Sequence, residues 1–272
     1  MPVFATETGE RSWSARTRRE TIATWFGWFA LVALTVFCWR VMTADTIWEF
    51  VYDAPRQASD IFGRMLPPRW EYANRLWIPL WDTLNIATLG TLLAILLGTP
   101  LGFLAARNTT PSVAFVRPIA LLIIVSSRSI NALIWGLLLV SILGPGVLAG
   151  IIAIALRSVG FIGKLLYEAI EEIDETQVEA IRATGATTAQ VTTYGIVPQV
   201  LPIFATICVF RWDINIREST VLGLVGAGGL GLALEASLNT LAWPQVTLIL
   251  IVILATVVAS EWISAKVRAR FG

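Results

Sequence analysis

The chain has 272 residues, of which 56% are hydrophobic and only 14% are charged, and its formal net charge is +1. Soluble domains carry roughly 25% charged residues, so much of this surface is expected to face lipid rather than water. The small net charge argues against a nucleic-acid partner, and the absence of histidine removes the commonest general base and metal ligand. The composition predicts a membrane protein with no catalytic residues and no metal site of its own.

Six apolar runs are long enough to cross a bilayer, because a helix needs about 20 residues to span a hydrocarbon core of roughly 30 Å. Polar residues 126–129 interrupt the third run, and a Gly-Pro-Gly turn at 144–146 separates it from the fourth. We therefore predict an all-α integral membrane protein with about six transmembrane helices. The runs lie at 22–41, 83–106, 118–142, 146–168, 200–225 and 243–265.

The first run also resembles a secretory signal, because it follows a basic segment that contains Arg11, Arg16, Arg18 and Arg19. Its apolar stretch exceeds the roughly 7–15 residues of a signal, and residues 42–44 make a poor cleavage site. We therefore expect a retained helix.

The positions of basic residues predict that both termini face the cytoplasm, since cytoplasmic loops are enriched in Lys and Arg. With six spans, every short basic loop falls on that side. Residues 45–80 are too polar to cross and are expected to lie along the outer surface. The basic residues that support this orientation, besides the N-terminal arginines, are Arg107, Arg117, Lys164, Arg182, Lys266, Arg268 and Arg270.

The two cysteines, Cys38 and Cys208, both lie inside apolar runs. A disulfide or a soft metal pair is the alternative, but the pattern favours buried, unreactive thiols.

Ionisable residues inside predicted spans are costly, so they mark a pathway or a paired site. At about 100° per residue, Arg211, Asn215 and Glu218 share one face of the fifth run. Asp213 and Arg217 share another face and are expected to neutralise each other. Counting Arg128 and Arg157 as well, four arginines less two acids leave a charge of +2 inside the membrane per chain.

Two interpretations of these charges remain open. The arginines can bond buried carbonyls and acids and hold the helices together, or they can form an electropositive, hydroxyl-lined cavity for a small anion, since guanidinium matches phosphoryl oxygens. The candidate path residues are Ser126, Ser127, Arg128, Ser129, Asn131, Arg157, Arg211, Asn215, Arg217 and Glu218.

The polar stretch 168–199, between the fourth and fifth runs, predicts a short helix, a glycine turn and a second helical piece. Good helix formers surround Glu179 and Ala180, Gly185 is a natural C-cap, and Pro198 can open the next helix. An ordinary cytoplasmic connector is the alternative. The spacing of these four residues resembles the EAA loop of the membrane subunits of ABC importers, with Val197 in the place of leucine.

Two positions depart from that pattern, because Ile181 replaces the third small residue and Gly195 replaces isoleucine. We expect Gly195 to loosen the exit of the loop. The resemblance implies that the loop docks on a separate ATPase subunit through Glu179 and Gly185. It also implies that ATP and Mg²⁺ are bound by that partner, so no cofactor is expected in this chain.

Gly226, Gly228 and Gly231 fit the dinucleotide-binding pattern G-x-G-x-x-G. That interpretation needs a preceding strand and an acidic residue roughly 20 positions later. Here a predicted span precedes the glycines, and residues 246–255 are aliphatic or small. A flexible turn at the outer membrane face is the favoured prediction. No Walker A sequence occurs, so ATP hydrolysis is expected elsewhere.

Residues 126–135, 144–154, 157–172 and 215–231 resemble phosphonate ABC-transporter permeases more narrowly. The resemblance implies the type I ABC importer permease fold in the plasma (inner) membrane. It also implies three partners, namely a second copy of this chain, an ABC ATPase and an extracytoplasmic substrate-binding protein. The implied cargo is a phosphonate, phosphite or phosphate ester.

Other functions stay open at this point. The cargo can be another small solute, such as an amino acid or oxyanion, or the chain can be an ATP-independent channel, a secondary carrier or a membrane enzyme. The coupling loop disfavours a channel, and the lack of histidine and of a clustered acid pair disfavours an enzyme. We predict residues 1–80 as a tail, first helix and outer-surface segment, and 81–272 as the permease domain with coupling loop 168–199.

Overall fold

The computed structural model describes residues 3–5, 11–13 and 18–270. The chain divides into two compact units, Met1–Asp60 and Ile61–Gly272. The boundary falls within α2 (Trp48–Met65), in the segment that the sequence places along the outer surface.

In the first unit, β1 (Val3–Ala5) pairs antiparallel with β2 (Arg11–Trp13). Helix α1 (Arg18–Thr43) contains the first predicted span, and none of its residues is buried. Cys38 is therefore exposed, which corrects the expectation of a buried thiol; Cys208 is partly buried, and both are free. Arg16, one of the basic residues behind the orientation prediction, lies outside the described residues.

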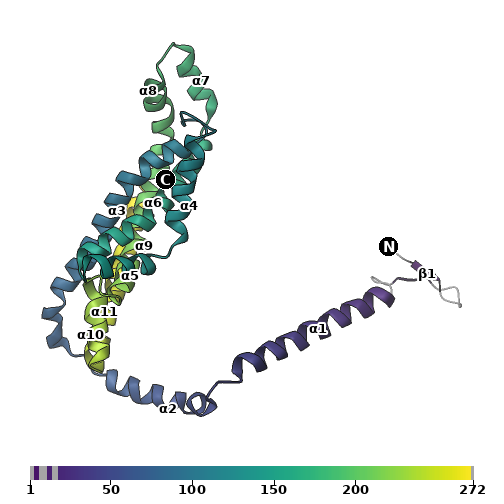
Figure 1. The fold of residues 1–272 in the computed structure, drawn as a ribbon, viewed down its shortest axis with the longest axis vertical. Helices are drawn as coiled ribbons and strands as arrows, with labels where there is room; N and C mark the ends of the chain where they lie inside the picture. The colour runs from purple at the N-terminus through teal and green to yellow at the C-terminus, as the bar shows by residue number, and fades with distance from the viewer. Residues whose placement is uncertain (1–2, 6–10, 14–17, 271–272) are drawn as a thin grey trace. The chain divides into compact units, whose positions relative to one another are not determined.

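The second unit is a bundle of long helices from which α7 and α8 project at one end (Figure 1). Apart from the short N-terminal hairpin the described chain is helical, which confirms the all-α fold class. The elements of the bundle are η1 (Trp70–Arg75), α3 (Trp77–Ala105), α4 (Val116–Ser129), α5 (Ala132–Leu143), α6 (Val147–Glu171), α7 (Glu175–Ala183), α8 (Thr188–Val191), the π-helix η2 (Thr192–Ile196), α9 (Val197–Gly223), α10 (Gly229–Asn239) and α11 (Trp243–Arg268).

Among the described residues, five helical stretches are long and apolar enough to cross a membrane, in α1, α3, α6, α8–α9 and α11. The third predicted span is not one continuous helix, because α4 and α5 meet at an angle of 86°. Ile130 adopts an extended conformation, and Asn131 then caps α5 by accepting a hydrogen bond from Leu133 N at 3.2 Å. The pair supplies a sixth span if it is counted as one.

The central pair of helices, α3 and α6, packs closely because glycines on α3 face large side chains on α6. A β-carbon at Gly102 would lie 2.7 Å from Leu166 Cδ2, and one at Gly90 would lie 2.8 Å from Ile154 Cγ2. Small residues at helix contacts are typical of membrane bundles, where backbones approach closely. This packing fixes the position of α6, which carries Arg157.

The glycine-rich turn after α9 packs closely against neighbouring elements, and its predicted flexibility stays a prediction. Gly226, Gly228 and Gly229 have φ angles of +89°, +90° and +74°, which favour glycine. Gly226 O accepts a hydrogen bond from Gly146 N at 3.0 Å, and this contact joins the turn to the Gly-Pro-Gly turn. A helix precedes the motif, as predicted, but α10 begins within it at Gly229 and was not predicted.

Candidate functional site

The predicted path residues at the end of α4 do not converge on one cavity. Ser127 Oγ donates to Leu156 O and accepts from Gly160 N at 2.9 Å, so this hydroxyl joins α4 to α6. Ser129 Oγ donates to Val125 O at 2.7 Å within its own helix. These hydroxyls are thus engaged with the backbone.

Arg128 is partly buried, and no ion-pair partner for it occurs within the part of the chain that the structure describes. Ser126, its neighbour, is exposed. The roles of these two residues in a substrate path stay predictions.

Helices α6 and α9 bring the other predicted residues together. Glu218 is paired with Arg157, and its Oε2 lies 3.4 Å from Arg211 Nη2. Arg211 Nε donates to Ser158 Oγ at 3.1 Å, and Ser158 Oγ donates to Asn215 Oδ1 at 3.0 Å. The predicted shared face of Arg211, Asn215 and Glu218 is confirmed, and it faces α6. We call Arg157, Arg211, Asp213, Arg217 and Glu218 the arginine cluster.

Besides Ser158, the partners of this network that were not predicted include Phe161 and Thr91. The Phe161 ring lies 4.5 Å from Arg211 Cζ and 5.5 Å from Arg157 Cζ, so it packs against both guanidinium groups. Thr91 Oγ1 accepts from Asn215 Nδ2 at 2.7 Å, which joins α3 to the network. Phe161 follows Arg157 by four residues, and this helical spacing is a signal in the sequence; Thr91 carries no comparable signal.

The predicted pair of Asp213 and Arg217 is confirmed, with Arg217 Nη2 at 2.5 Å from Asp213 Oδ2. The other carboxylate oxygen of Asp213 accepts from Ser260 Oγ of α11 at 2.7 Å. The Asp213 side chain is 5% exposed, whereas that of Arg217 is 47% exposed. Asp213 therefore ties α9 to α11 and also orients an accessible arginine.

A cavity of about 240 Å³ lies beside this cluster, where the start of α5 meets α6 and α9. Four predicted path residues line it, while Arg211 and Asn215 lie buried behind them. Its volume is several times the roughly 30 Å³ that one water occupies in the liquid, so it has room for a small oxyanion. The lining residues are Asn131, Ala132, Leu133, Arg157, Arg217, Glu218, Val221 and Leu222.

At the projecting end of the bundle, the loop 168–199 has the helix, turn and second helix that its sequence predicts. Asp174 caps α7 by accepting from Thr176 N at 3.0 Å, and Gly185 ends it with a φ of +80°. Glu179, Ala180 and Pro198 are exposed. The loop thus offers an accessible helical surface.

The two departures from the EAA pattern pack together. Gly195 is buried in η2, and a β-carbon there would lie 3.3 Å from Ile181 Cδ1. Ile181 fills the space beside Gly195, while the expectation that Gly195 loosens the exit stays a prediction.

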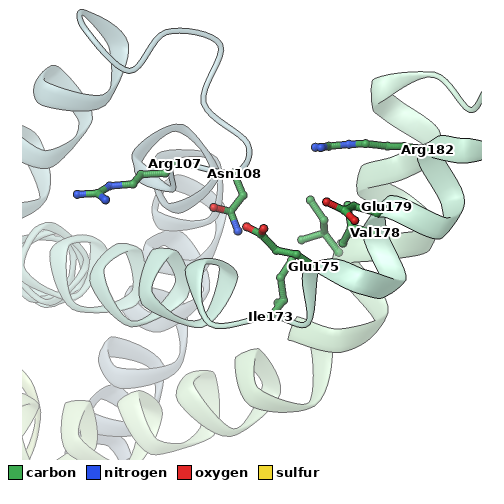
Figure 2. A pocket seen from close by; sticks show the side chains of 8 residues that line it. Arg107, Asn108, Ile173, Glu175, Val178, Glu179 and Arg182 are labelled. Carbon is green, nitrogen blue, oxygen red and sulfur yellow. The ribbon is translucent and has the colours of Figure 1, made fainter.

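A second cavity, of about 310 Å³, lies between α7 and the loop after α3. Figure 2 shows Glu175, Glu179 and Arg182 projecting from α7 toward this space, with Asn108 on the opposite side. The Arg107 guanidinium points away from α7 (Figure 2). The cavity is therefore bordered by charges of both signs on α7.

The end of α6 is joined to the loop after α3 by one carboxylate. Glu171 Oε1 accepts from Arg107 N at 2.9 Å and from Arg117 Nη2 at 3.1 Å. Asn108 Nδ2 donates to Ile170 O at 3.0 Å. We call these contacts the α6 clasp; they connect the helix that leads into α7 with α3 and α4.

Comparison with known proteins identifies the architecture. The family described as binding-protein-dependent transport system inner membrane component matches residues 98–270. The phosphite transport system permease protein PtxC of Stutzerimonas stutzeri is 41% identical over 244 residues, which cover 89% of this chain and 86% of that protein. The phosphate-import permease protein PhnE of Mycolicibacterium smegmatis is 41% identical over 224 residues, which cover 81% of this chain and 42% of that protein.

Among solved structures, a chain of the MetNI methionine ABC transporter in an inward-facing conformation matches with a TM-score of 0.65 and 22% identity. The match covers 75% of this chain and 99% of that chain. At this identity the likeness shows the shared fold.

Proposed function

The chain belongs to the family of binding-protein-dependent transport system inner membrane components, and on this premise we propose that its cargo is phosphite, a phosphonate or a related small phosphorus oxyanion. As a member of this family it is a multi-pass permease of the inner membrane and a transport subunit rather than an enzyme. The two relatives described above are named for phosphite and phosphate.

The observation that carries the cargo proposal is the arginine cluster beside the cavity of about 240 Å³. Three arginines against two acids leave a charge of +1 there. Charged groups within membrane spans are costly and are retained where they serve a pathway or a paired site. Guanidinium groups bind phosphoryl oxygens through paired hydrogen bonds, so this site favours an oxyanion over a cation.

The exposed surface of α7 and the turn at Gly185 support coupling to an ABC ATPase, which binds ATP and Mg²⁺. In this proposal Glu179, Ala180, Gly185 and Pro198 transmit the closure of the ATPase, and both termini lie on its side of the membrane. A second copy of the chain completes the pathway, and an extracytoplasmic substrate-binding protein delivers the cargo.

Uptake in proteoliposomes tests this function. The permease, its ATPase and its binding protein are reconstituted together, and ATP-dependent uptake of phosphite, phosphate and methylphosphonate is compared with that of sulfate and methionine. We expect uptake of one or more phosphorus oxyanions and little uptake of methionine. Preferred uptake of methionine or sulfate would overturn the cargo proposal, and uptake without ATP or the ATPase would overturn the coupling.

A further inference from the structure

The Glu218 carboxylate is shared by two arginines of unequal accessibility. One of its oxygens accepts from Arg157 Nη1, and the other lies 3.4 Å from Arg211 Nη2. The Arg211 side chain is 5% exposed and is held by Ser158 and the Phe161 ring. Glu218 and Arg157 are 17% and 21% exposed, and both line the cavity. Of the three residues around this carboxylate, Arg157 and Glu218 are therefore the accessible ones; Arg217, which lines the same cavity, is paired with Asp213.

Arg157 retains hydrogen-bonding capacity beyond this pair. Its Nε is buried and has no hydrogen-bond partner among the described residues. A guanidinium presents its N–H groups as a rigid fork, and a carboxylate or phosphoryl group fills two of them at once. Glu218 accepts from Arg157 through Nη1 alone, whereas a phosphoryl group with several oxygens can fill two N–H groups of a guanidinium.

Arg157 also needs a counter-ion at every stage of transport, because an unpaired charge away from water is costly. Glu218 meets this need before a transported anion arrives. An entering anion that takes its place on Arg157 keeps this guanidinium paired. Arg211 keeps Glu218 beside the cavity during the exchange, because Arg211 is itself fixed by Ser158 and Phe161.

We propose that the Glu218 carboxylate occupies the place of the transported oxyanion on Arg157 while the site is empty. An entering oxyanion then displaces the Glu218 carboxylate from Arg157. Glu218 returns to Arg157 as the anion leaves, and this return helps to release the cargo. No covalent bond changes, since one anion replaces another on the same guanidinium. The inference rests on the proposed function for the class of cargo and adds the residue that controls occupancy of the site.

Equilibrium binding of inorganic phosphate and methylphosphonate to the permease–ATPase complex in lipid nanodiscs, without the binding protein, tests this inference. E218Q keeps the shape of the side chain but removes the competing charge, so we expect phosphate to bind about tenfold more tightly. ATP-driven uptake by E218Q is expected to be slower, because a neutral glutamine does not return to Arg157 to help release the bound anion. E171Q removes a carboxylate that pairs with Arg117 in the α6 clasp and is expected to leave phosphate binding unchanged.

R157K provides an independent variant, since lysine keeps the positive charge but lacks the paired N–H groups of the guanidinium. We expect R157K to weaken phosphate binding about tenfold, because a lysine binds as a point charge. Phosphate binding by E218Q that is no tighter than in the parent, with an intact complex on size-exclusion chromatography, would overturn the inference. Unchanged binding by R157K would overturn it as well.

The two proposals fail in different ways. If the parent complex imports methylphosphonate but E218Q binds phosphate like the parent, the inference on Glu218 fails and the proposed function stands. If the parent imports none of the phosphorus oxyanions, yet E218Q tightens the binding of sulfate, only the proposed cargo fails.

Discussion

Ile181 and Gly195 lie against each other at the base of the coupling loop, where a β-carbon on Gly195 would approach Ile181 Cδ1 to 3.3 Å. Each residue by itself departs from the pattern of the EAA loop. Together they compensate each other in volume, because the larger Ile181 side chain on α7 faces Gly195, which has no side chain. The close contact holds α7 against the π-helix that leads into α9.

Gly195→Ile, which restores the residue typical of the pattern, is expected to destabilise the folded protein by about 1–3 kcal/mol, as overpacking of a filled site does. Ile181→Ala in the same chain makes room and is expected to recover most of the loss. Thermal unfolding of the purified complex measures both. Thr193→Ile is the control, because this side chain lies in the same π-helix, two residues before Gly195, and is exposed. A Gly195→Ile variant as stable as this control would contradict the prediction.

The α6 clasp is expected to contribute to stability through Glu171. Glu171→Ala removes hydrogen bonds to Arg107 N and Arg117 Nη2, and a hydrogen bond to a charged group contributes about 1.5–3 kcal/mol. We therefore expect a lower unfolding temperature and slower ATP-driven uptake. Glu168→Ala breaks only a more exposed pair with Lys164 and is expected to change stability by less than about 1 kcal/mol. Equal unfolding temperatures for the two variants would count against the clasp.

Glu179→Ala is expected to weaken binding of the ATPase while leaving the permease folded, because the side chain is exposed on α7. The loss of one central interface residue often costs more than 1 kcal/mol, so a fall in affinity of about tenfold is expected. Co-purification and surface plasmon resonance with the isolated ATPase measure it. Glu172→Ala is the matched control, since Glu172 is also an exposed acid but precedes α7. A similar affinity for both variants would remove Glu179 from the docking surface.

The charged face of α9 was predictable because helical periodicity depends only on positions within one segment. It placed Arg211 and Glu218 together and paired Asp213 with Arg217, as the structure shows. The partner Thr91 was not predictable, because it lies on α3, 124 residues from Asn215 in the sequence. A contact between two segments that are distant in the sequence does not appear as a periodic pattern in either segment.

The bend between α4 and α5 shows a different limit of sequence reasoning. Average hydropathy over 118–142 predicts one span, yet Asn131 is a favourable N-cap that starts a new helix. The local N-cap at Asn131 therefore determined the break between α4 and α5, although the average hydropathy predicted one continuous helix. Helix α10 was not predicted, because it is short and begins with glycines, a pattern typical of a loop. In the structure it packs against α3, α9 and α11.

Arg128→Gln provides a test of the remaining path residues at the end of α4. Arg128 is partly buried and does not line the cavity beside Arg157. If Arg128 serves the path at another depth, its loss is expected to slow oxyanion uptake several-fold while phosphate binding at the cavity stays unchanged. Initial uptake rates in proteoliposomes and equilibrium binding in nanodiscs separate these effects. Ser141→Ala is the control, because it removes an exposed hydroxyl outside the candidate path without a change in charge. Uptake by Arg128→Gln equal to that of Ser141→Ala would exclude Arg128 from the path, since loss of a guanidinium that lines an anion route is expected to raise the barrier to the anion.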